Sequence, residues 1–369
     1  MSYPLFYKEV VMNVTNTFNI NFKGNIIDSH VHVGTFNGNV YTKDNLDIFV
    51  KSNLPNKDNV EKMIVSDLDV LCGLNNEFDG NKTVLNIFKN DKKYALLASC
   101  NPQKGNISDI EKLFKKYPNK FVGLKFHSSI QNLNLTSEKY KPYLDFASQN
   151  NLPCLFHSQV ALLKDGKINP NKKHIADPES IYNLAKKYSK LPFVMAHLGA
   201  GWNEAYEKAI DVLIEAIKNN DANLYADISW VDIDNPTIHI IKAIKRLKGI
   251  GDKDWRYGDQ SYRLMFGTDA PLERFGEKGA LKTYSDFVDK IKTSIRNDKD
   301  LSKDAEKIID DLFYNNAKKL YLSQAQVVQK KKGNILSKKN ILILAILVAV
   351  CGITVAVLQA QNYFKMHTS

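Results

Sequence analysis

Short apolar runs rich in β-branched residues recur along the chain, and stretches with helical periodicity separate them. Eight of these runs predict strands, at 25–33, 62–67, 94–99, 121–127, 152–157, 192–197, 223–229 and 263–268. Helical patterns lie between them, including 82–90, 107–117, 137–150, 178–189, 203–219 and 236–248. Alternating strands and helices imply parallel strands joined by right-handed crossovers. Eight such units over roughly 270 residues predict a (β/α)8 TIM barrel.

An open, doubly wound sheet is the main alternative to the barrel. That fold would normally carry a glycine-rich phosphate-binding turn after an early strand, and the sequence contains none. Two further helical patterns, at 281–296 and 303–322, complete the domain. We therefore expect an N-terminal extension over 1–24 and a barrel domain over 25–322.

A long uncharged segment near the C-terminus predicts a membrane span. Residues 341–358 contain no charged side chain, and at ~1.5 Å per residue they extend roughly 27 Å, close to the hydrocarbon thickness of a bilayer. A buried core helix is the alternative, but it would usually show a polar face. The prediction is a linker over 323–340, a transmembrane helix over 341–360 and a short tail over 361–369.

The charge of the chain is concentrated beside this segment. The net charge is +11, but five lysines lie between 330 and 339, whereas the body of the chain mixes lysines with acids. Basic residues on one side of a span favour the cytoplasm for the preceding domain. The prediction is a single-pass C-terminal anchor with the catalytic domain in the cytoplasm, a membrane as partner and no nucleic-acid partner.

The cysteines and the N-terminus favour the same compartment. The four cysteines lack any CxxC spacing, so they predict neither a disulfide framework nor a thiolate zinc site. Residues 1–22 contain no apolar core typical of a signal peptide, so cleavage of a leader is not expected.

Histidines gather at the predicted ends of the strands. Five of the eight lie there, namely His30, His32, His127, His157 and His197. In a barrel this end carries the active site, because the loops after the strands open there. The histidines at 30 and 32 point to the same side of one strand, with Asp28 one step deeper, so both imidazoles can face one ion. An HxH pair alone is also compatible with two surface histidines.

Asp269 ends the eighth predicted strand and is the candidate carboxylate of the same site. A turn or helix-capping aspartate is the simpler interpretation of an isolated residue of this type. Beside a histidine cluster, a carboxylate can bind a divalent ion and take a proton from a water that the ion acidifies. The sequence therefore predicts a catalytic or metal-binding role for Asp269.

These motifs resemble the amidohydrolase superfamily, and specifically amidohydrolase family 2, which includes the aminocarboxymuconate-semialdehyde decarboxylase-like enzymes. The resemblance runs from about residue 26 to residue 322. The matching stretches are IIDSHVHVG (26–34), VGLKFH (122–127), PCLFHS (153–158), FVMAHLGAGW (193–202), YADIS (225–229), MFGTDAPL (265–272) and FYNNAKKLY (313–321).

The resemblance implies a divalent metal ion, zinc or alternatively manganese, held by His30, His32 and His157. Asp269 would be the remaining protein ligand or the base. His197 would polarise the substrate or act as acid and base; in a binuclear site it would bind the second ion instead. Family members are often dimers, so a homodimer is an expectation as well.

Lys125 ends the fourth predicted strand, where binuclear relatives carry a carboxylated lysine that bridges two ions. Its alternatives are a cation that holds a substrate carboxylate, which we expect, and a buried salt-bridge lysine. No family role can be given to His127, and a hydrogen-bonded histidine at the mouth of the barrel is expected there.

The remaining candidates are weaker. Asp227 would orient a metal-binding histidine through its second nitrogen, with Asp28 also supporting the site, although a turn or cap role for Asp227 is equally compatible. Trp202 and Arg274 would bind substrate, the alternatives being a packed tryptophan and a surface arginine.

Three functions remain in view. The first is metal-dependent hydrolysis of a small carboxylated lactone, amide or ester through a metal-activated water. The second is non-oxidative decarboxylation of an unsaturated or aromatic carboxylic acid, with Asp269 or His197 supplying the proton. The third is an inactive, membrane-anchored scaffold; we disfavour it because every expected ligand position is present.

Overall fold

A computed structural model describes residues 25–53, 60–161, 169–200, 203–231, 236–249, 263–271 and 284–322. The predicted N-terminal extension, linker, membrane span and tail lie outside these residues, as do Trp202 and Arg274.

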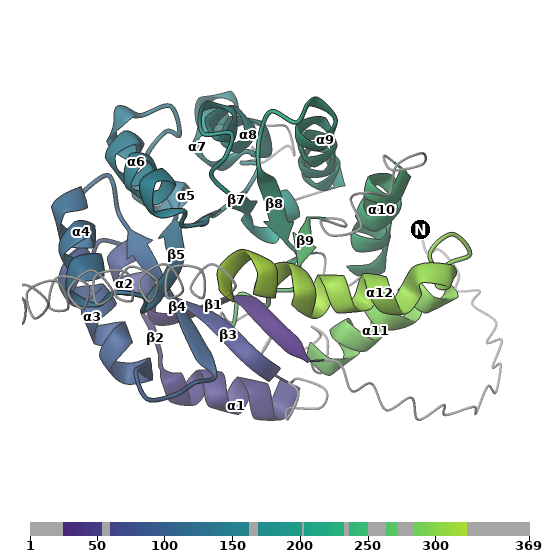
Figure 1. The fold of residues 1–369 in the computed structure, drawn as a ribbon, viewed down its shortest axis with the longest axis horizontal. Coiled ribbons are helices and arrows are strands. Elements are labelled where there is room, and N and C mark those ends of the chain that lie inside the picture. Colours follow the sequence, from purple (N-terminus) through teal and green to yellow (C-terminus); the bar gives the residue numbers. More distant parts are fainter. Residues whose placement is uncertain are drawn as a thin grey trace, which may run out of the picture.

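A curled nine-stranded sheet forms the centre of the fold (Figure 1), with the strand order β2-β1-β3-β4-β5-β6-β7-β8-β9. The strands are β1 (Ile26–Phe36), β2 (Asn39–Tyr41), β3 (Val60–Asp67), β4 (Tyr94–Cys100), β5 (Phe121–Phe126), β6 (Cys154–Phe156), β7 (Phe193–Met195), β8 (Leu224–Asp227) and β9 (Leu264–Met265). All neighbouring pairs are parallel except β1 and β2, which form an antiparallel hairpin. Eight parallel strands therefore correspond to the eight predicted ones.

The sheet curls far enough for its last parallel strand to meet its first. Val31 and Ala270 form a parallel bridge just beyond β9. The Ser29 N–H donates to the Phe266 carbonyl at 3.0 Å, and the Asp269 N–H donates to the His30 carbonyl at 2.7 Å. These bonds place the ends of β1 and β9 side by side, as in a TIM-type barrel.

Helices surround the sheet (Figure 1). They are α1 (Lys43–Asn53), α2 (Leu68–Leu71), α3 (Glu77–Phe88), α4 (Ile107–Lys116), α5 (Ser128–Gln131), α6 (Lys141–Asn150), α7 (Lys173–Ala176), α8 (Pro178–Lys187), α9 (Asn203–Asn219), α10 (Pro236–Gly249), α11 (Tyr284–Asn297) and α12 (Ala305–Asp310). Several begin at polar caps: Asn76 accepts from the Asp79 N–H before α3, and Asp177 accepts from the Ser180 N–H before α8.

The apolar core has two parts, one on each face of the sheet. The larger part packs the outer face of the strands against the helices. The smaller part joins single residues of several strands, including Ile27, Leu97, Leu155 and Val194, on the opposite face. Leu320 and Tyr321, in the helical turn η9 (Lys318–Leu322), pack against this inner cluster.

The predicted membrane anchor needs correction. Among the residues that the structure describes, no helix is long and apolar enough to cross a membrane. The predicted fold, a barrel followed by a transmembrane helix, is therefore replaced by an α/β fold with a curled nine-stranded sheet. The predicted membrane location falls with it. The segment predicted to span the membrane, 341–360, itself lies outside the described residues.

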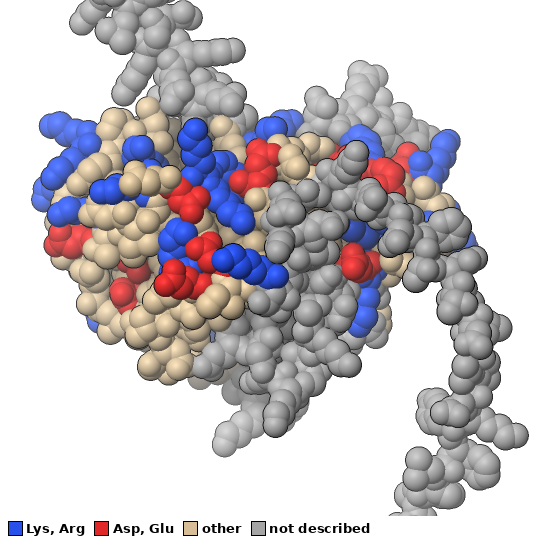
Figure 2. Space-filling model, turned by 90° about the horizontal axis from the view of Figure 1, so that it is seen from below, with Lys and Arg blue, Asp and Glu red and all other residues tan. Residues whose placement is uncertain are grey.

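Charged side chains of both signs lie next to one another on the face shown in Figure 2. Among the described residues, ion pairs join neighbouring helices and loops, such as Arg246 with Asp211 and Lys245 with Asp300, each at 2.6 Å. Exposed pairs of this kind contribute little to stability, typically ~0–1 kcal/mol.

Candidate active site

The HxH pair lies buried on β1, with both rings turned to one side. His30 and His32 are 1% and 2% exposed, and their Nε2 atoms lie 3.1 Å apart. The register of β1 against β3 shifts between Asp28 and Val31, which marks an irregularity beside the pair. Two imidazoles therefore face the same point near the end of the first strand.

Asp269 approaches the two histidines from the segment that follows β9, the strand that meets β1. Its Oδ1 lies 3.0 Å from His32 Nε2 and 3.3 Å from His30 Nε2. Its backbone has a φ of 63°, a left-handed conformation that is uncommon for an aspartate. The hydrogen bond from its N–H to the His30 carbonyl fixes this turn, so the carboxylate stays close to both histidines.

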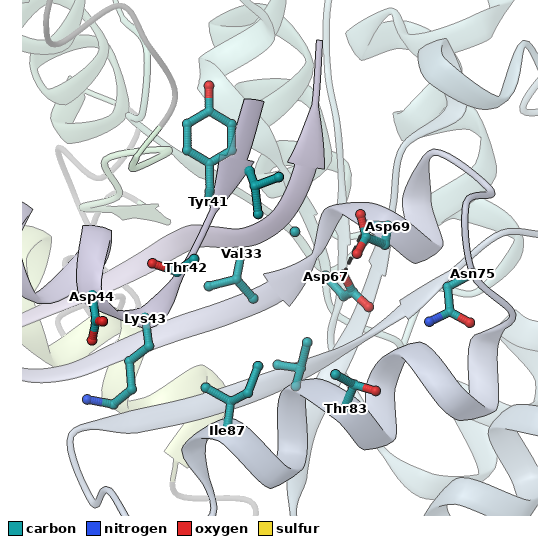
Figure 3. Close-up of a pocket in the computed structure, with 13 residues that line it drawn as sticks. Val33, Tyr41, Thr42, Lys43, Asp44, Asp67, Asp69, Asn75, Thr83 and Ile87 are labelled. Carbon is teal, nitrogen blue, oxygen red and sulfur yellow. Dashed lines mark hydrogen bonds between the residues drawn. The ribbon is translucent and has the colours of Figure 1, made fainter. Parts of the chain in front are cut away.

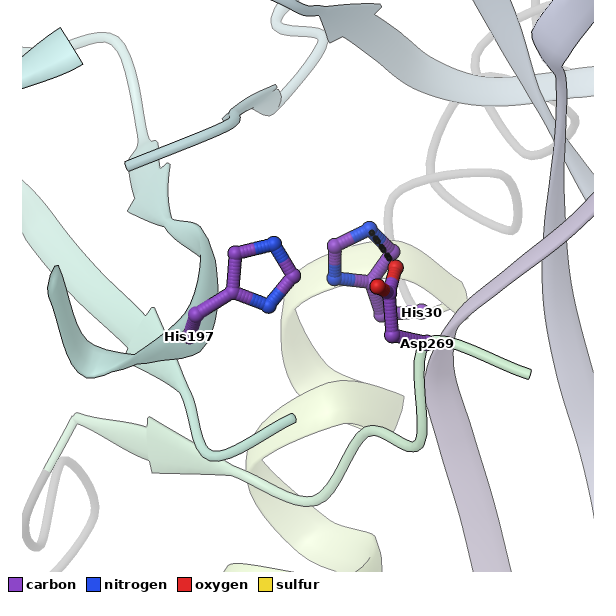
Figure 4. Close-up of side chains that lie close together, drawn as sticks. All are labelled: His30, His197 and Asp269. Carbon is purple, nitrogen blue, oxygen red and sulfur yellow. Dashed lines mark ion pairs between the residues drawn. The ribbon is translucent and has the colours of Figure 1, made fainter. Parts of the chain in front are cut away.

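His197 lies across from His30 (Figure 4). It sits in the turn η4 (Ala196–Gly199) after β7, where His197 and Leu198 have φ values of 61° and 44°. The rings of His30 and His197 stack with centroids 5.0 Å apart. One ligand atom from each of His30, His197 and Asp269 lies within 4.8 Å of the others. The structure thus gathers three buried groups that could hold one ion.

Asp227 and Ser229, at and just after the end of β8, decide which ring nitrogens carry hydrogen. The Ser229 hydroxyl donates to Asp227 Oδ1, so its oxygen is left to accept from His197 Nδ1 at 2.8 Å. His30 Nδ1 lies 2.9 Å from Asp227 Oδ2 and must donate to it. Both histidines therefore direct an Nε2 lone pair into the cluster, where it can accept a hydrogen bond or bind a metal ion.

A second set of hydrogen bonds positions His32 and the segment that carries Asp269. Ser66, in β3, lies 2.8 Å from His32 Nδ1. Asp28 accepts from the Thr268 hydroxyl at 2.6 Å and from the Thr268 N–H at 3.0 Å, which ties β1 to the segment that carries Asp269. Asp28 thus lies next to the site, and its supporting role there stays a prediction.

Lys125 is fully buried on β5 and points into the same cluster. Its Nζ lies 2.8 Å from His30 Nε2, to which the ammonium donates. Burial lowers the pKa of Lys125 to about 8, while Asp269 and Asp227 act in the opposite direction. A cation therefore lies at the centre of the site, available for a negatively charged group.

Protonation states in the cluster suit a metal ion. Burial lowers the pKa of His197 to about 4 and also lowers that of His30 and His32, so the imidazoles are neutral at pH 7. Burial raises the pKa of Asp269, but the positive charges that His197 and His30 carry when they are protonated, together with a hydrogen bond to His32, outweigh it and hold that pKa below its usual value. Neutral imidazoles and an ionised carboxylate are the forms that bind metals.

The spacing of the donor atoms also fits one ion. Ligands at metal–nitrogen and metal–oxygen distances of about 2.0–2.2 Å around a tetrahedral ion lie roughly 3.3 Å from one another. The separations among His30 Nε2, His32 Nε2 and Asp269 Oδ1 are 3.0 to 3.3 Å. These three groups and His197 thus fit the metal that the sequence predicts.

His157, predicted as a metal ligand, contacts His197 and lies farther from His30 and Asp269 than His197 does. Its Nδ1 is 3.2 Å from His197 Nε2, and its ring stacks on His127 with centroids 3.8 Å apart. The grouping of His30, Asp269 and a third residue within 4.8 Å of one another contains His197 and not His157. The ligand role of His157 stays a prediction.

Sequence reasoning missed two serines. Ser229 contacts both His30 and His197, and Ser66 contacts His32. Both lie at strand ends, the position that drew attention to the histidines, but serine is too common for its type to stand out.

A cavity of about 370 Å³ lies beside β1 and β3 (Figure 3). Asp67 and Asp69 line it, and the Asp67 carboxylate accepts from the Asp69 N–H at 2.9 Å. Burial raises the pKa of Asp67 to about 7. None of the histidines of the cluster lines this cavity.

A family described as amidohydrolase matches residues 118–322. This chain belongs to the amidohydrolase family. It is accordingly a metal-dependent enzyme of the amidohydrolase superfamily. No curated protein matches the chain.

Solved structures resemble this amidohydrolase in fold. An amidohydrolase from Burkholderia multivorans with bound zinc is 13% identical, with a TM-score of 0.52 over 80% of this chain and 99% of that one. A putative amidohydrolase from Staphylococcus aureus is 14% identical, with a TM-score of 0.51 over 80% and 99%. The 5-carboxyvanillate decarboxylase from Sphingomonas paucimobilis is 12% identical, with a TM-score of 0.50 over 80% and 98%.

Proposed function

We propose that this amidohydrolase hydrolyses a small carboxylated lactone, amide or ester with the help of one divalent ion. The observation that carries the proposal is the convergence of His30 Nε2, His197 and Asp269 within 4.8 Å, each buried and each presenting a lone pair. His32 adjoins them through its Nε2. Zinc is the ion we propose, and the relative from Burkholderia multivorans holds zinc.

The ion would supply Lewis-acid chemistry and acidify a water molecule. His30, His32 and Asp269 would hold it, with His157 as a further ligand. Asp269 stays ionised in this environment, so it can take a proton from the attacking water and pass it to the leaving group. His197 offers a neutral Nε2 that can accept a hydrogen bond or a proton.

Lys125 would balance negative charge during the reaction. Its ammonium lies 2.8 Å from His30 Nε2, close to where the substrate carbonyl would meet the ion. A fixed, buried cation stabilises a developing oxyanion more than an exposed one, because water does not screen it. The same cation could hold a substrate carboxylate.

Decarboxylation of an unsaturated or aromatic carboxylic acid is the second candidate. This reaction needs a proton for the carbon that loses carbon dioxide. Lys125 is a buried group that carries one, with a pKa lowered to about 8, chiefly by burial. By contrast, the lone pairs of His30, His197 and Asp269 accept protons rather than donate them, which favours hydrolysis.

The test begins with the metal content of the purified protein and of the His30→Ala variant. We expect about one ion per chain in the first and a large loss in the second. His174→Ala is the matched control, because His174 lies outside the cluster and contacts Ser180. An active protein that contains no metal and is indifferent to His30→Ala would refute the proposal.

Panels of lactones, amides, esters and carboxylic acids then separate the two reactions. Hydrolysis incorporates an oxygen atom from labelled water into the product. Release of carbon dioxide without such incorporation would establish the decarboxylase and exclude the hydrolase.

A further inference from the structure

The neighbouring parallel strands β5 and β6 end at Phe126 and Phe156, and the same three residues, Phe-His-Ser, occupy positions 126–128 and 156–158. Phe126 and Phe156 are partners in the register of β5 and β6, and their rings stack with centroids 4.6 Å apart. The next pair, His127 and His157, also stacks. The two segments that follow these strands therefore leave the sheet side by side and at the same level.

The serine of each triplet has an unmet hydrogen-bonding group. Ser128 and Ser158 are both fully buried, and neither hydroxyl has a hydrogen-bond partner among the residues that the structure describes. Buried polar groups are normally paired, so two adjacent exceptions point to polar contacts that are made with water or a ligand.

The residue after each of these serines lines a cavity of about 270 Å³. Ser129 approaches it from α5, and Gln159 approaches it from the segment after β6. The opposite wall comes from the region of η3 (Pro170–Lys172) and α7. The Gln159 N–H donates to the Ala176 carbonyl at 2.8 Å, and the Leu135 N–H donates to the His174 carbonyl at 3.0 Å. Backbone hydrogen bonds therefore hold the walls together.

The polar lining of this cavity favours an anion. Its polar side chains are one hydroxyl, three carboxamides and one ammonium, contributed by Ser129, Asn132, Gln159, Asn169 and Lys172. Among the residues that the structure describes, no aspartate or glutamate lines it. Lys172 forms no ion pair with any described residue. A carboxylate can accept from ammonium and carboxamide N–H groups at once, and such charge-assisted bonds are stronger than neutral ones.

The side chains of Gln159 and His157 separate the cavity from the cluster. Gln159 Oε1 lies 3.4 Å from His157 Nε2, and His157 Nδ1 lies 3.2 Å from His197 Nε2. A ligand seated against Gln159 would therefore be two side chains away from His197.

We propose that this cavity binds a carboxylate of a small molecule through Lys172, Asn132 and Gln159. This binding site goes beyond the proposed function, because none of the histidines of the cluster lines the cavity.

Calorimetric titration of the full chain with glutarate, and separately with its uncharged dimethyl ester, tests the assignment. Glutarate should bind and the ester should not. Lys172→Met should weaken glutarate binding about tenfold, since a hydrogen bond to a charged group is lost. Gln159→Ala should weaken it as well. Lys187→Met, at the exposed end of α8, is the matched control and should leave the affinity unchanged.

The His30→Ala variant separates this proposal from the proposed function. If the variant loses its metal and still binds glutarate in a manner that depends on Lys172, the cavity assignment holds whatever reaction the enzyme catalyses. Equal affinity of Lys172→Met and the unaltered protein for glutarate would overturn the assignment, even if the metal site and hydrolysis were established.

Discussion

Asp227 determines the hydrogen positions of two histidines at once. Its Oδ2 accepts from His30 Nδ1, while its Oδ1 accepts from the Ser229 hydroxyl and from the His197 N–H. No orientation of an asparagine can satisfy all these donors, because one side of its amide must itself donate. An exchange of one oxygen for nitrogen should therefore disturb either His30 or the turn that carries His197.

We predict that Asp227→Asn lowers the metal affinity or activity about 10- to 100-fold. The measurement is metal affinity by competition with a chelator, together with the rate on any substrate found in the panels. Asp221→Asn is the control, because Asp221 accepts only from Tyr182 among the described residues. Equal metal affinity in the two variants would show that Asp227 does not determine which ring nitrogen of His30 carries the hydrogen.

The buried carboxyl group of Glu77, which lies away from the histidine cluster, should make the stability of the protein depend on pH. It is 1% exposed, and it accepts from the Asn101 N–H at 2.6 Å and from the Tyr143 hydroxyl at 2.9 Å. Burial raises the pKa of Glu77 from 4.5 to about 7, although these hydrogen bonds act against the shift. The folded protein thus holds this proton more tightly than the unfolded chain does.

The free energy of unfolding should fall as the pH rises from about 4.5 towards 7, by at most about 3 kcal/mol from this group. Glu77→Gln should flatten that part of the profile, since glutamine has no proton to lose. Urea unfolding at pH 5.5 and pH 7.5 measures the slope, with the exposed Glu111→Gln as control. A variant with the same slope as the unaltered protein would exclude Glu77 as its source.

At the scale of single elements, Gly123 shows how tightly the strands of the curled sheet pack. A Cβ at this position would lie 2.5 Å from the Pro153 carbonyl oxygen and 2.9 Å from Leu97. The first contact is with backbone, which cannot rotate away. We predict that Gly123→Ala lowers the free energy of unfolding by about 1–3 kcal/mol.

Gly38→Ala is the informative comparison for Gly123→Ala. A Cβ at Gly38 would meet nothing within 4 Å, but its φ of +81° disfavours any side chain. That variant should lose about 1 kcal/mol through backbone conformation alone. Thermal and urea unfolding of both variants measures the difference. If Gly123→Ala were the milder of the two, close packing of β5 against Pro153 would not be the reason for glycine.

The eight parallel strands could be predicted from the sequence because each is a buried run of apolar residues. Their ends could not. The last predicted strand, 263–268, is the two-residue β9 in the structure, and the fifth, 152–157, is the three-residue β6. The hairpin strand β2 was missed, since all three of its residues are partly or fully exposed and it lacks an apolar run.

The site was predictable as a cluster but not in its internal order. Residue type and strand-end position select His30, His32, His197 and Asp269, and all four meet. Which histidine side chain turns into the site depends on backbone conformation, such as the left-handed conformation of His197. The pattern of apolar residues in the sequence does not reveal that conformation. In the structure His197 is grouped with His30 and Asp269, and His157 lies beyond His197.

At the scale of the whole molecule, the helical segment that contains Leu312, Tyr314 and Asn316 joins β9, the last parallel strand of the sheet, to β3. The Phe266 N–H donates to the Leu312 carbonyl at 2.8 Å, and Asn316 donates to the Leu264 carbonyl at 2.9 Å. Tyr314 donates to Glu61, in β3, at 2.6 Å. The segment thus holds β9 and β3 on either side of β1, and the curled sheet depends on a part of the chain far from it in sequence.

Tyr321 tests how this segment stabilises the sheet. Its side chain is 1% exposed and packs against the inner cluster of strand residues, yet its hydroxyl has no hydrogen-bond partner within the described ranges. An aromatic ring in this position contributes by burial, whereas an unpaired buried hydroxyl costs about 1–3 kcal/mol. The ring and the hydroxyl should therefore have opposite effects on stability.

We predict that Tyr321→Ala lowers the free energy of unfolding by about 3–5 kcal/mol, whereas Tyr321→Phe leaves it unchanged or raises it by about 1 kcal/mol. Tyr314→Phe is the matched control: it removes a hydroxyl that donates to Glu61, so it should destabilise the protein. Urea unfolding of the three variants measures these changes. A clear loss of stability in Tyr321→Phe would mean that its hydroxyl is paired, and that the segment is fastened to the sheet by a polar contact as well as by burial.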